Sequence, residues 1–237
     1  MPEKELINMK YDILLLDADD TLFDFGLAER EAIRRVCRQR GLPASDAVCD
    51  RYSEINLSLW KKFEQGLVTQ DRLRAERFEI LLAELDARDD AHAFSEAYTD
   101  ALGEGAFLLP GAYELCKELS ARCPLYIVTN GVIRTQKNRL AHSQIAPFIS
   151  RMFISQELGA PKPRREFFDR VFEALGGPDR SRAIILGDSL TSDMAGGRNA
   201  GIACCWLAPS GAEGDPALYD YRIDTLSGFI PIVMGES

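Results

Sequence analysis

The stretch LLLDADDTLFDF (residues 14–25) joins an apolar run directly to four carboxylates. A continuous apolar run is typical of a strand that is buried on both faces of a parallel sheet. Alternate residues of an extended chain share a side, so Asp17 and Asp19 point together while Asp20 points away from them. Asp24 follows two apolar residues further on, and the general preference of Asp for turns predicts a turn or capping residue there.

Four more apolar runs have the character of buried strands. Helical patterns separate the later runs, and the alternation of strand and helix predicts an α/β fold with a Rossmann-like, doubly wound parallel sheet. One of these helical patterns places five apolar residues on one stripe before Gly176, which predicts a helix stop there. Another begins at Ser192, a predicted helix cap. The expected strands are YDILLLD (11–17), LYIVTN (125–130), RMFIS (151–155), RAIILGD (182–188) and IACCWL (202–207).

The segment between the first two expected strands is helical throughout. It is far longer than a crossover connection needs, so it predicts an inserted helical bundle of domain size. We expect a core made of 1–23 and 107–237 and a helical cap made of 24–106. Ligands of doubly wound sheets bind outside the carboxyl ends of the strands, where this insert leaves the core. The expected helices of the insert are 27–40, 46–65, 70–87 and 91–102.

Composition limits the compartment and the partners. A net charge of −9 argues against a nucleic-acid partner, because binding a polyanion requires concentrated Lys and Arg. The sequence shows no apolar run of membrane-spanning length and no signal peptide, so we expect a cytoplasmic protein without a membrane partner. Its six cysteines lack CxxC spacing and are expected to be reduced. The Cys116-x5-Arg122 spacing matches that of cysteine-dependent phosphatases, but its intervening residues are helical and contain no glycine.

Polar side chains follow three of the expected strands at the point where each strand ends. The carboxyl ends of parallel strands meet at one edge of the sheet, so these groups are expected to converge in space. A lysine lies between two prolines in GAPKPRREF, just before an expected helix. The residues concerned are Asp17, Asp19, Thr129, Asn130, Asp188, Asp193 and Lys162.

This combination of side chains has a chemical meaning. Carboxylates gathered at one place repel one another and need a hard cation, and oxygen ligands suit Mg²⁺. Mg²⁺ in turn favours a phosphate among its remaining ligands. The hydroxyl of Thr129, the amide of Asn130 and the ammonium of Lys162 suit the other oxygens of that phosphate. The sequence therefore predicts a phosphoryl-transfer site.

In this order, the motifs DADDT (17–21), IVTNG, APKP and GDSLTSD (187–193) resemble those of the haloacid dehalogenase-like hydrolase superfamily. The helical insert after the first motif resembles the subfamily with a helical cap. The resemblance implies that Asp17 attacks phosphorus and forms an aspartyl-phosphate. It also implies that Asp19 protonates the leaving alkoxide and then deprotonates the attacking water.

The same resemblance implies the remaining roles at the site. Mg²⁺ would be held by Asp17, the backbone carbonyl of Asp19 and Asp188. Asp193 would orient Lys162 or a metal-bound water. The resemblance implies that Lys162 is a catalytic residue, as are Asp17 and Asp19. The residues implied to bind the substrate phosphate are Thr129, Asn130 and Lys162.

Longer segments, among them residues 56–78 and the C-terminal GDSLTSDMAGGRNAGIACCWL, resemble the pyrimidine 5'-nucleotidase branch. This implies a small-molecule substrate, a pyrimidine nucleoside monophosphate such as UMP, dUMP or dTMP. In the cap, Asn56, Trp60 and Arg77 offer an amide, a ring and a cation for a base. Helical spacing favours a simpler interpretation, in which Trp60 and Phe78 are bundle core and Arg77 is a surface charge.

Other functions remain open at this stage. A phosphoglycolate phosphatase, a sugar-phosphate phosphatase or a phosphomutase would share the core motifs and differ in the cap. A receiver-like signalling domain also combines a phosphorylatable Asp with a Thr and a Lys, but the helical insert has no place in it. A dehalogenase is not expected to keep Asp19. The sequence leaves the choice between monomer and homodimer open.

Overall fold

The computed structural model describes residues 9–209 and 211–236, and the chain divides into two compact units. The first unit consists of the described parts of Met1–Leu22, Leu108–Asn130 and Gln144–Ser237. The second unit consists of Phe23–Phe107 and Gly131–Ser143. The long segment of the second unit follows the bounds expected for the cap within one residue at each end. Its short segment differs from the expected division, which placed those residues in the core.

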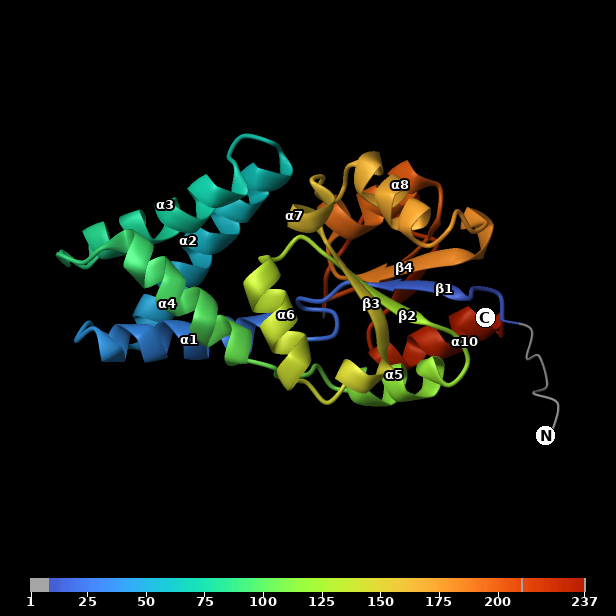
Figure 1. Cartoon of the computed structure of the whole chain (residues 1–237), viewed down its shortest axis with the longest axis horizontal. Coiled ribbons are helices and arrows are strands. Elements are labelled where there is room, and N and C mark those ends of the chain that lie inside the picture. Colours follow the sequence, from blue (N-terminus) through green and yellow to red (C-terminus); the bar gives the residue numbers. More distant parts are fainter. Residues whose placement is uncertain (1–8, 210, 237) are drawn as a thin grey trace. The chain divides into compact units, whose positions relative to one another are not determined.

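The first unit is built on a parallel sheet in the order β3-β2-β1-β4-β5-β6 (Figure 1). Five strands lie where the apolar runs predict them, which confirms the α/β fold. The sixth was not predicted, because its three residues include the exposed, charged Arg222. The strands are β1 (Ile13–Leu16), β2 (Leu125–Thr129), β3 (Ile149–Ile154), β4 (Ala183–Gly187), β5 (Ala203–Leu207) and β6 (Tyr221–Ile223).

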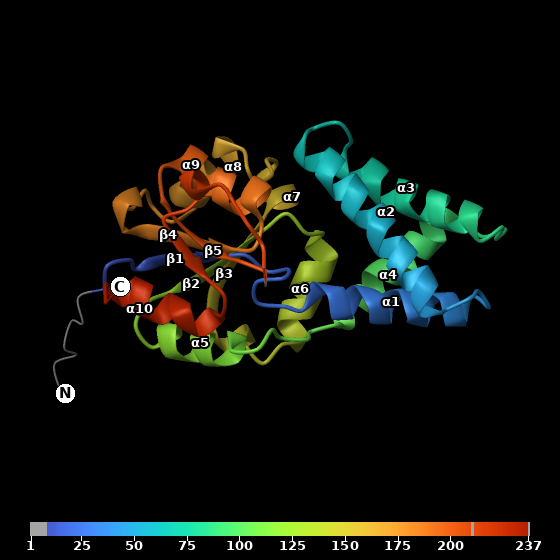
Figure 2. The same cartoon turned by 180° about the vertical axis from the view of Figure 1, so that it is seen from behind.

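Helices cover both faces of this sheet, with α8 and α9 on one face and α5 and α10 on the other (Figures 1 and 2). The predicted apolar stripe of α8 is buried against the sheet, and Gly176 beyond its end has a φ of +86°. Cys116 lies inside α5, so the phosphate-loop interpretation does not hold. The helices of this unit are α5 (Ala112–Ser120), α7 (Ser155–Leu158), α8 (Arg165–Ala174), α9 (Ala195–Ala200) and α10 (Phe229–Met234).

The second unit is a helical bundle. Asp24 caps its first helix, because its carboxylate accepts a hydrogen bond from the backbone N–H of Leu27 at 2.8 Å, as expected of a capping residue. The unexpected member is α6, which packs against α4 (Figure 1). The bundle contains α1 (Phe25–Gln39), α2 (Asp46–Glu64), α3 (Gln70–Glu84), α4 (Ala91–Glu104) and α6 (Ile133–His142). No helix within residues 9–209 and 211–236 is both long and apolar enough to cross a bilayer.

Aromatic rings form the centre of this bundle. The rings of Tyr52 and Phe78 are stacked with their centroids 5.2 Å apart, and Tyr98 packs on both. Phe78 is fully buried, and the partly buried Trp60 packs against the same cluster with its ring perpendicular to that of Phe63. Phe78 is therefore bundle core, as predicted, whereas Trp60 lies at the edge of the core and keeps part of its surface exposed.

Arg77 is not the surface charge that helical spacing favours. Only 4% of it is exposed, and its guanidinium carbon lies 4.8 Å from the ring centroid of Tyr98. Its Nη1 donates to Asn56 Oδ1 at 3.1 Å, and Asn56 Nδ2 donates to Glu29 Oε1 at 2.7 Å. Burial raises the pKa of Glu29, while hydrogen bonds, including that from Asn56, and the charge of Arg77 oppose the rise. These three residues, which we call the buried network, join α1, α2 and α3.

Replacing Arg77 by Leu should destabilise the second unit by about 3 kcal/mol or more, because Glu29 and Asn56 would lose their buried cationic neighbour. Urea unfolding followed by circular dichroism measures the loss. The matched control is Arg72→Leu on the same helix, which removes only exposed ion pairs to Glu76 and Glu79 and should leave stability nearly unchanged. Equal losses in the two variants would contradict a stabilising role for the buried network.

Candidate active site

Three carboxylates converge in the first unit. Asp17 directly follows β1, Asp188 directly follows β4, and Asp193 lies five residues further along. Each offers one oxygen, and these oxygens lie within 4.8 Å of one another. The parallel order of the strands explains this meeting, since β1 and β4 are neighbours and end at the same edge of the sheet. We call the three residues the acidic cluster.

A buried lysine ties the acidic cluster together. The ammonium of Lys162 donates to Asp17 Oδ1 at 2.5 Å, to Asp193 Oδ1 at 2.6 Å and to the backbone carbonyl of Val128 at 2.9 Å. These bonds use all three of its hydrogens. Only 2% of the Lys162 side chain is exposed. Lys162 comes from the loop between α7 and α8, so the contact brings together chain segments that are distant in the sequence.

Asn130 holds the loop that carries Lys162. Its Oδ1 accepts from the backbone N–H of Lys162 at 2.9 Å, and its Nδ2 donates to the backbone carbonyl of Lys162 at 2.8 Å. Nδ2 also lies 3.4 Å from Ser192 Oγ. The side chain expected to contact phosphate is thus engaged in positioning Lys162. Thr129, the other expected phosphate ligand of this motif, is buried at the end of β2.

The turn after β4 fixes Asp193. Residues Leu190–Met194 form one turn of π-helix, and Ser189 caps it by accepting from the backbone N–H of Ser192 at 3.1 Å. Ser189 is therefore the capping residue, in place of the predicted Ser192. The backbone N–H of Ser189 donates to Asp193 Oδ2 at 3.2 Å. The Asp193 carboxyl group can lie this close to the backbone only because residue 187 is a glycine. A Cβ at Gly187 would lie 2.4 Å from the Asp193 carboxyl carbon.

The rest of the first motif surrounds Asp17. Asp19 is partly buried, whereas Asp20 is exposed and has a φ of +55°, so the chain turns sharply after Asp19. Thr21 is fully buried, and its hydroxyl lies 3.5 Å from Asp17 Oδ2. Sequence reasoning did not assign a role to Thr21, although its place in DADDT beside the two aspartates was the available signal.

The electrostatics of the acidic cluster reflect an excess of negative charge. Burial raises the pKa of Asp17 to about 8; the carboxylate of Asp193 acts in the same direction and the ammonium of Lys162 opposes it. The pKa of Asp188 is raised well above its usual range by burial and by the charges of its acidic neighbours. Burial lowers the pKa of Lys162, but the carboxylates of Asp17 and Asp193 outweigh burial and raise it overall.

The donor set fits Mg²⁺. It consists of carboxylate oxygens, which hard divalent cations prefer, and Lys162 supplies a single positive charge to three carboxyl groups. Burial is the main cause of the raised pKa of Asp17 and of Asp188, and a cation would relieve the repulsion between carboxylates that adds to it. Both oxygens of Asp193 already accept hydrogen bonds, from Lys162 and from the Ser189 N–H. Oδ2 of Asp17, by contrast, has only the long 3.5 Å contact with the Thr21 hydroxyl among the described residues. Asp17 and Asp188 are therefore the better candidates for ligands, and Asp193 is better suited to orienting Lys162.

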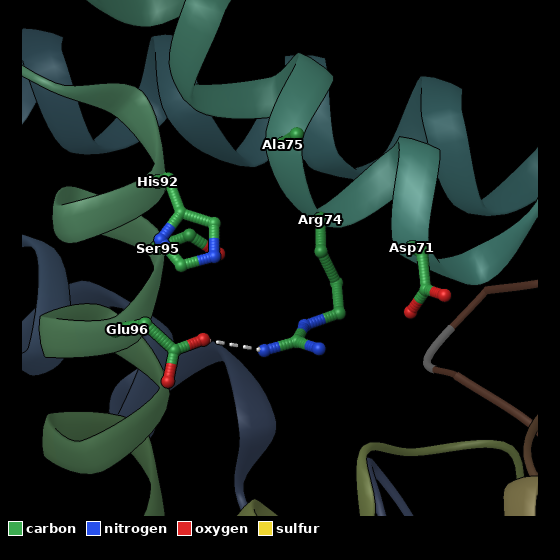
Figure 3. A pocket seen from close by; sticks show the side chains of 6 residues that line it. All are labelled: Asp71, Arg74, Ala75, His92, Ser95 and Glu96. Carbon is green, nitrogen blue, oxygen red and sulfur yellow. Dashed lines mark hydrogen bonds and ion pairs between the residues drawn. The ribbon is translucent and has the colours of Figure 1, made fainter.

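The expected cap residues differ in accessibility. Asn56 and Arg77 are buried in the network described above, and Trp60 keeps a partly exposed ring. The second unit also contains a pocket of about 160 Å³ between α3 and α4 (Figure 3). Inside it, Arg74 Nη2 donates to Glu96 Oε1 at 2.9 Å. Its lining consists of Asp71, Arg74, Ala75, His92, Ser95 and Glu96, and includes none of the three expected residues.

Comparison with known proteins agrees with this geometry. The haloacid dehalogenase-like hydrolase family matches residues 11–201. The chain is 39% identical to HAD-hydrolase YfnB of Bacillus subtilis over 84% of this chain and 85% of that one. A crystal structure of YfnB bound to magnesium has a TM-score of 0.89, covering 94% of this chain and 99% of that one, at 37% identity.

Two further relatives have named activities. Pyrimidine 5'-nucleotidase PynA of Streptococcus pneumoniae is 34% identical over 86% of this chain and 87% of its own. Pyrimidine 5'-nucleotidase YjjG of Escherichia coli is 33% identical over 84% of this chain and 87% of its own. The family match covers well over half of the sequence and includes the acidic cluster and Lys162. The chain therefore belongs to the haloacid dehalogenase-like hydrolase family.

Proposed function

We propose that this protein is a Mg²⁺-dependent phosphomonoesterase that hydrolyses pyrimidine nucleoside monophosphates through an aspartyl-phosphate on Asp17. The observation that carries the chemistry is the buried contact of Lys162 with Asp17 inside the acidic cluster. It joins a nucleophile to the cation that phosphoryl oxygens require. The substrate class is supported by the relatives PynA and YjjG, both named pyrimidine 5'-nucleotidases.

In the first step, a carboxylate oxygen of Asp17 attacks phosphorus while the bond from phosphorus to the ester oxygen breaks. Asp19 gives its proton to the leaving alkoxide. Lys162 holds Oδ1 of Asp17, and Thr21 lies beside Oδ2, so the nucleophile is held in one orientation. Asp17, the backbone carbonyl of Asp19 and Asp188 would hold Mg²⁺, which would neutralise charge on the nucleophile and on the phosphoryl group.

In the second step, Asp19 removes a proton from water as the water oxygen attacks phosphorus. The bond between phosphorus and the Asp17 oxygen breaks, which releases inorganic phosphate and restores the carboxylate. Thr129 is proposed to contact the phosphoryl oxygens through this sequence, and Lys162 to do so by exchanging one of its three hydrogen bonds for one to a phosphoryl oxygen. Asp193 and Asn130 are proposed to act on Lys162, the first through its carboxylate and the second through the lysine backbone.

The second unit is proposed to select the substrate, with Trp60 the most accessible of the three expected cap residues. On this proposal the partner is a small phosphate monoester and not a nucleic acid or a membrane, in keeping with the net charge of −9. A cytoplasmic location is also proposed, supported by six cysteines that are all free.

The two aspartates of the first motif should both be required for turnover. Asp17→Asn removes the nucleophile and should lower kcat by about 10³-fold or more. Asp19→Asn removes the proton donor and should lower kcat by about 10²-fold or more. The matched control is Asp20→Asn, because Asp20 is exposed and Asn tolerates its positive φ. Phosphate release measures the turnover of all three variants. Normal turnover in Asp17→Asn or Asp19→Asn would contradict the proposed mechanism.

A substrate panel should separate the nucleotidase from other phosphatases with the same core. We expect kcat/KM for UMP, dUMP and dTMP to exceed that for AMP, phosphoglycolate and hexose phosphates by about tenfold or more, the factor that 1.4 kcal/mol of transition-state binding gives. Phosphate release under a common Mg²⁺ concentration is the measurement. Preference for a sugar phosphate or phosphoglycolate would refute the pyrimidine assignment and leave the phosphatase chemistry standing.

The metal-free protein should lose stability as pH rises. The pKa of Asp17 is raised from 3.8 to about 8 in the folded protein. Between these two pH values the folded protein keeps a proton on Asp17, whereas the unfolded chain has lost it. Its contribution to stability is complete below the lower value and disappears as pH passes the upper one. Without metal, Tm should therefore fall between about pH 6 and about pH 8.5, and Mg²⁺ should raise Tm more at the higher pH. A metal-free Tm that rises over this range would contradict the prediction, and Asp17→Asn should flatten the dependence.

A further inference from the structure

Trp206 makes a direct contact with the backbone of the acidic cluster. Its indole Nε1–H donates to the carbonyl oxygen of Asp188 at 2.7 Å, and only 2% of the residue is exposed. Trp206 lies on β5, in register with Gly187 of β4. The paired part of the two strands ends at this register, so the indole supplies a hydrogen bond to the first carbonyl beyond the ladder.

The peptide group that accepts this bond also reaches the other side of the site. The carbonyl of Asp188 and the N–H of Ser189 belong to one planar peptide group. The carbonyl accepts from the indole of Trp206, and the N–H donates to Asp193 Oδ2 at 3.2 Å. The other oxygen of Asp193 holds Lys162 at 2.6 Å. A continuous chain of hydrogen bonds therefore runs from the indole through this peptide group to the lysine.

The indole itself is held firmly. The ring of Tyr219 packs on it with a centroid distance of 5.3 Å, and the guanidinium carbon of Arg222 lies 5.7 Å from its centroid. Gly214 lies so close that a Cβ there would be 2.8 Å from Cζ3 of the indole. A ring confined on these sides keeps its N–H aimed at one acceptor, which is what a group that orients others requires.

We propose that Trp206 is a positioning residue for the metal site, acting through the peptide group between Asp188 and Ser189. By fixing that plane it constrains the Cα atom of Asp188, which carries the carboxylate, and it orients the N–H that donates to Asp193. This inference rests on the proposed function, because the site that it orders is the proposed Mg²⁺ site. Loss of the indole N–H leaves a buried carbonyl without its donor and frees the peptide group to rotate.

Trp206→Phe removes the N–H and keeps an aromatic ring in the strand. Loss of a group that orients metal ligands typically weakens metal binding by about 10- to 100-fold, and we expect a Mg²⁺ Kd weaker by about tenfold. Calorimetric titration with Mg²⁺, without substrate, measures the change. The matched control is Trp60→Phe, which alters the other of the two tryptophans and should leave the Kd unchanged.

A second measurement needs no change at position 206. The indole N–H signals of the two tryptophans are resolved by ¹⁵N-edited NMR and assigned with Trp60→Phe. The Trp206 signal should exchange slowly with solvent and should shift as Mg²⁺ is added, whereas the Trp60 signal should stay in place. A Trp206 signal that is unmoved at saturating Mg²⁺ would overturn the proposal, even if Trp206→Phe does not fold.

Activity gives a further readout that a packing role alone would not change. In Trp206→Phe, phosphate release at low Mg²⁺ should fall and should recover as Mg²⁺ is raised, because the defect lies in metal binding. Equal Mg²⁺ affinity in Trp206→Phe and the unaltered protein would refute the role of Trp206 and leave the proposed function intact. Absence of Mg²⁺ binding in the unaltered protein would refute both.

Discussion

The buried ammonium of Lys162 is the interaction on which the rest of the candidate site depends. A charged amine that is removed from water is tolerated only where nearby opposite charges compensate it, and here Asp17 and Asp193 lie at hydrogen-bonding distance. The requirement is mutual, since the carboxyl groups of the acidic cluster would otherwise repel one another without relief. The sheet topology satisfies both needs by bringing strand ends together. Asn130, Ser189 and Gly187 then fix the segments that carry the charged groups.

The sequence predicts most of the first unit, because its information is local. Five strands are continuous apolar runs, and each of β1, β2 and β4 ends at a polar motif, so position along the chain already gives position on the sheet edge. The convergence of Asp17 and Asp188 follows from parallel topology without any knowledge of side-chain contacts. The three-residue β6 escapes prediction because a strand of that length carries too little pattern.

The features that the sequence does not predict are contacts between the side chains and backbone atoms of distant segments. The amide of Asn130 is expected to bind phosphate, and nothing in a Thr-Asn-Gly turn reveals that it also makes hydrogen bonds to the backbone atoms of Lys162. Arg77 follows the spacing of a surface charge, yet Asn56 and two aromatic rings make its burial favourable. The contact of Trp206 with Asp188 depends on the register of β5 against β4. Such facts belong to packing between segments and not to any segment alone.

The buried network of Glu29, Asn56 and Arg77 has a consequence for directed evolution of substrate range. Each of three helices contributes one member, so a single random replacement there disturbs the order of the whole bundle. Libraries that vary these positions are therefore expected to contain many destabilised variants. The pocket residues Arg74 and His92 lie outside this network, and mutations there leave its hydrogen bonds in place. Within this bundle, the positions of the buried network should therefore be kept, and the pocket positions Arg74 and His92 can be randomised.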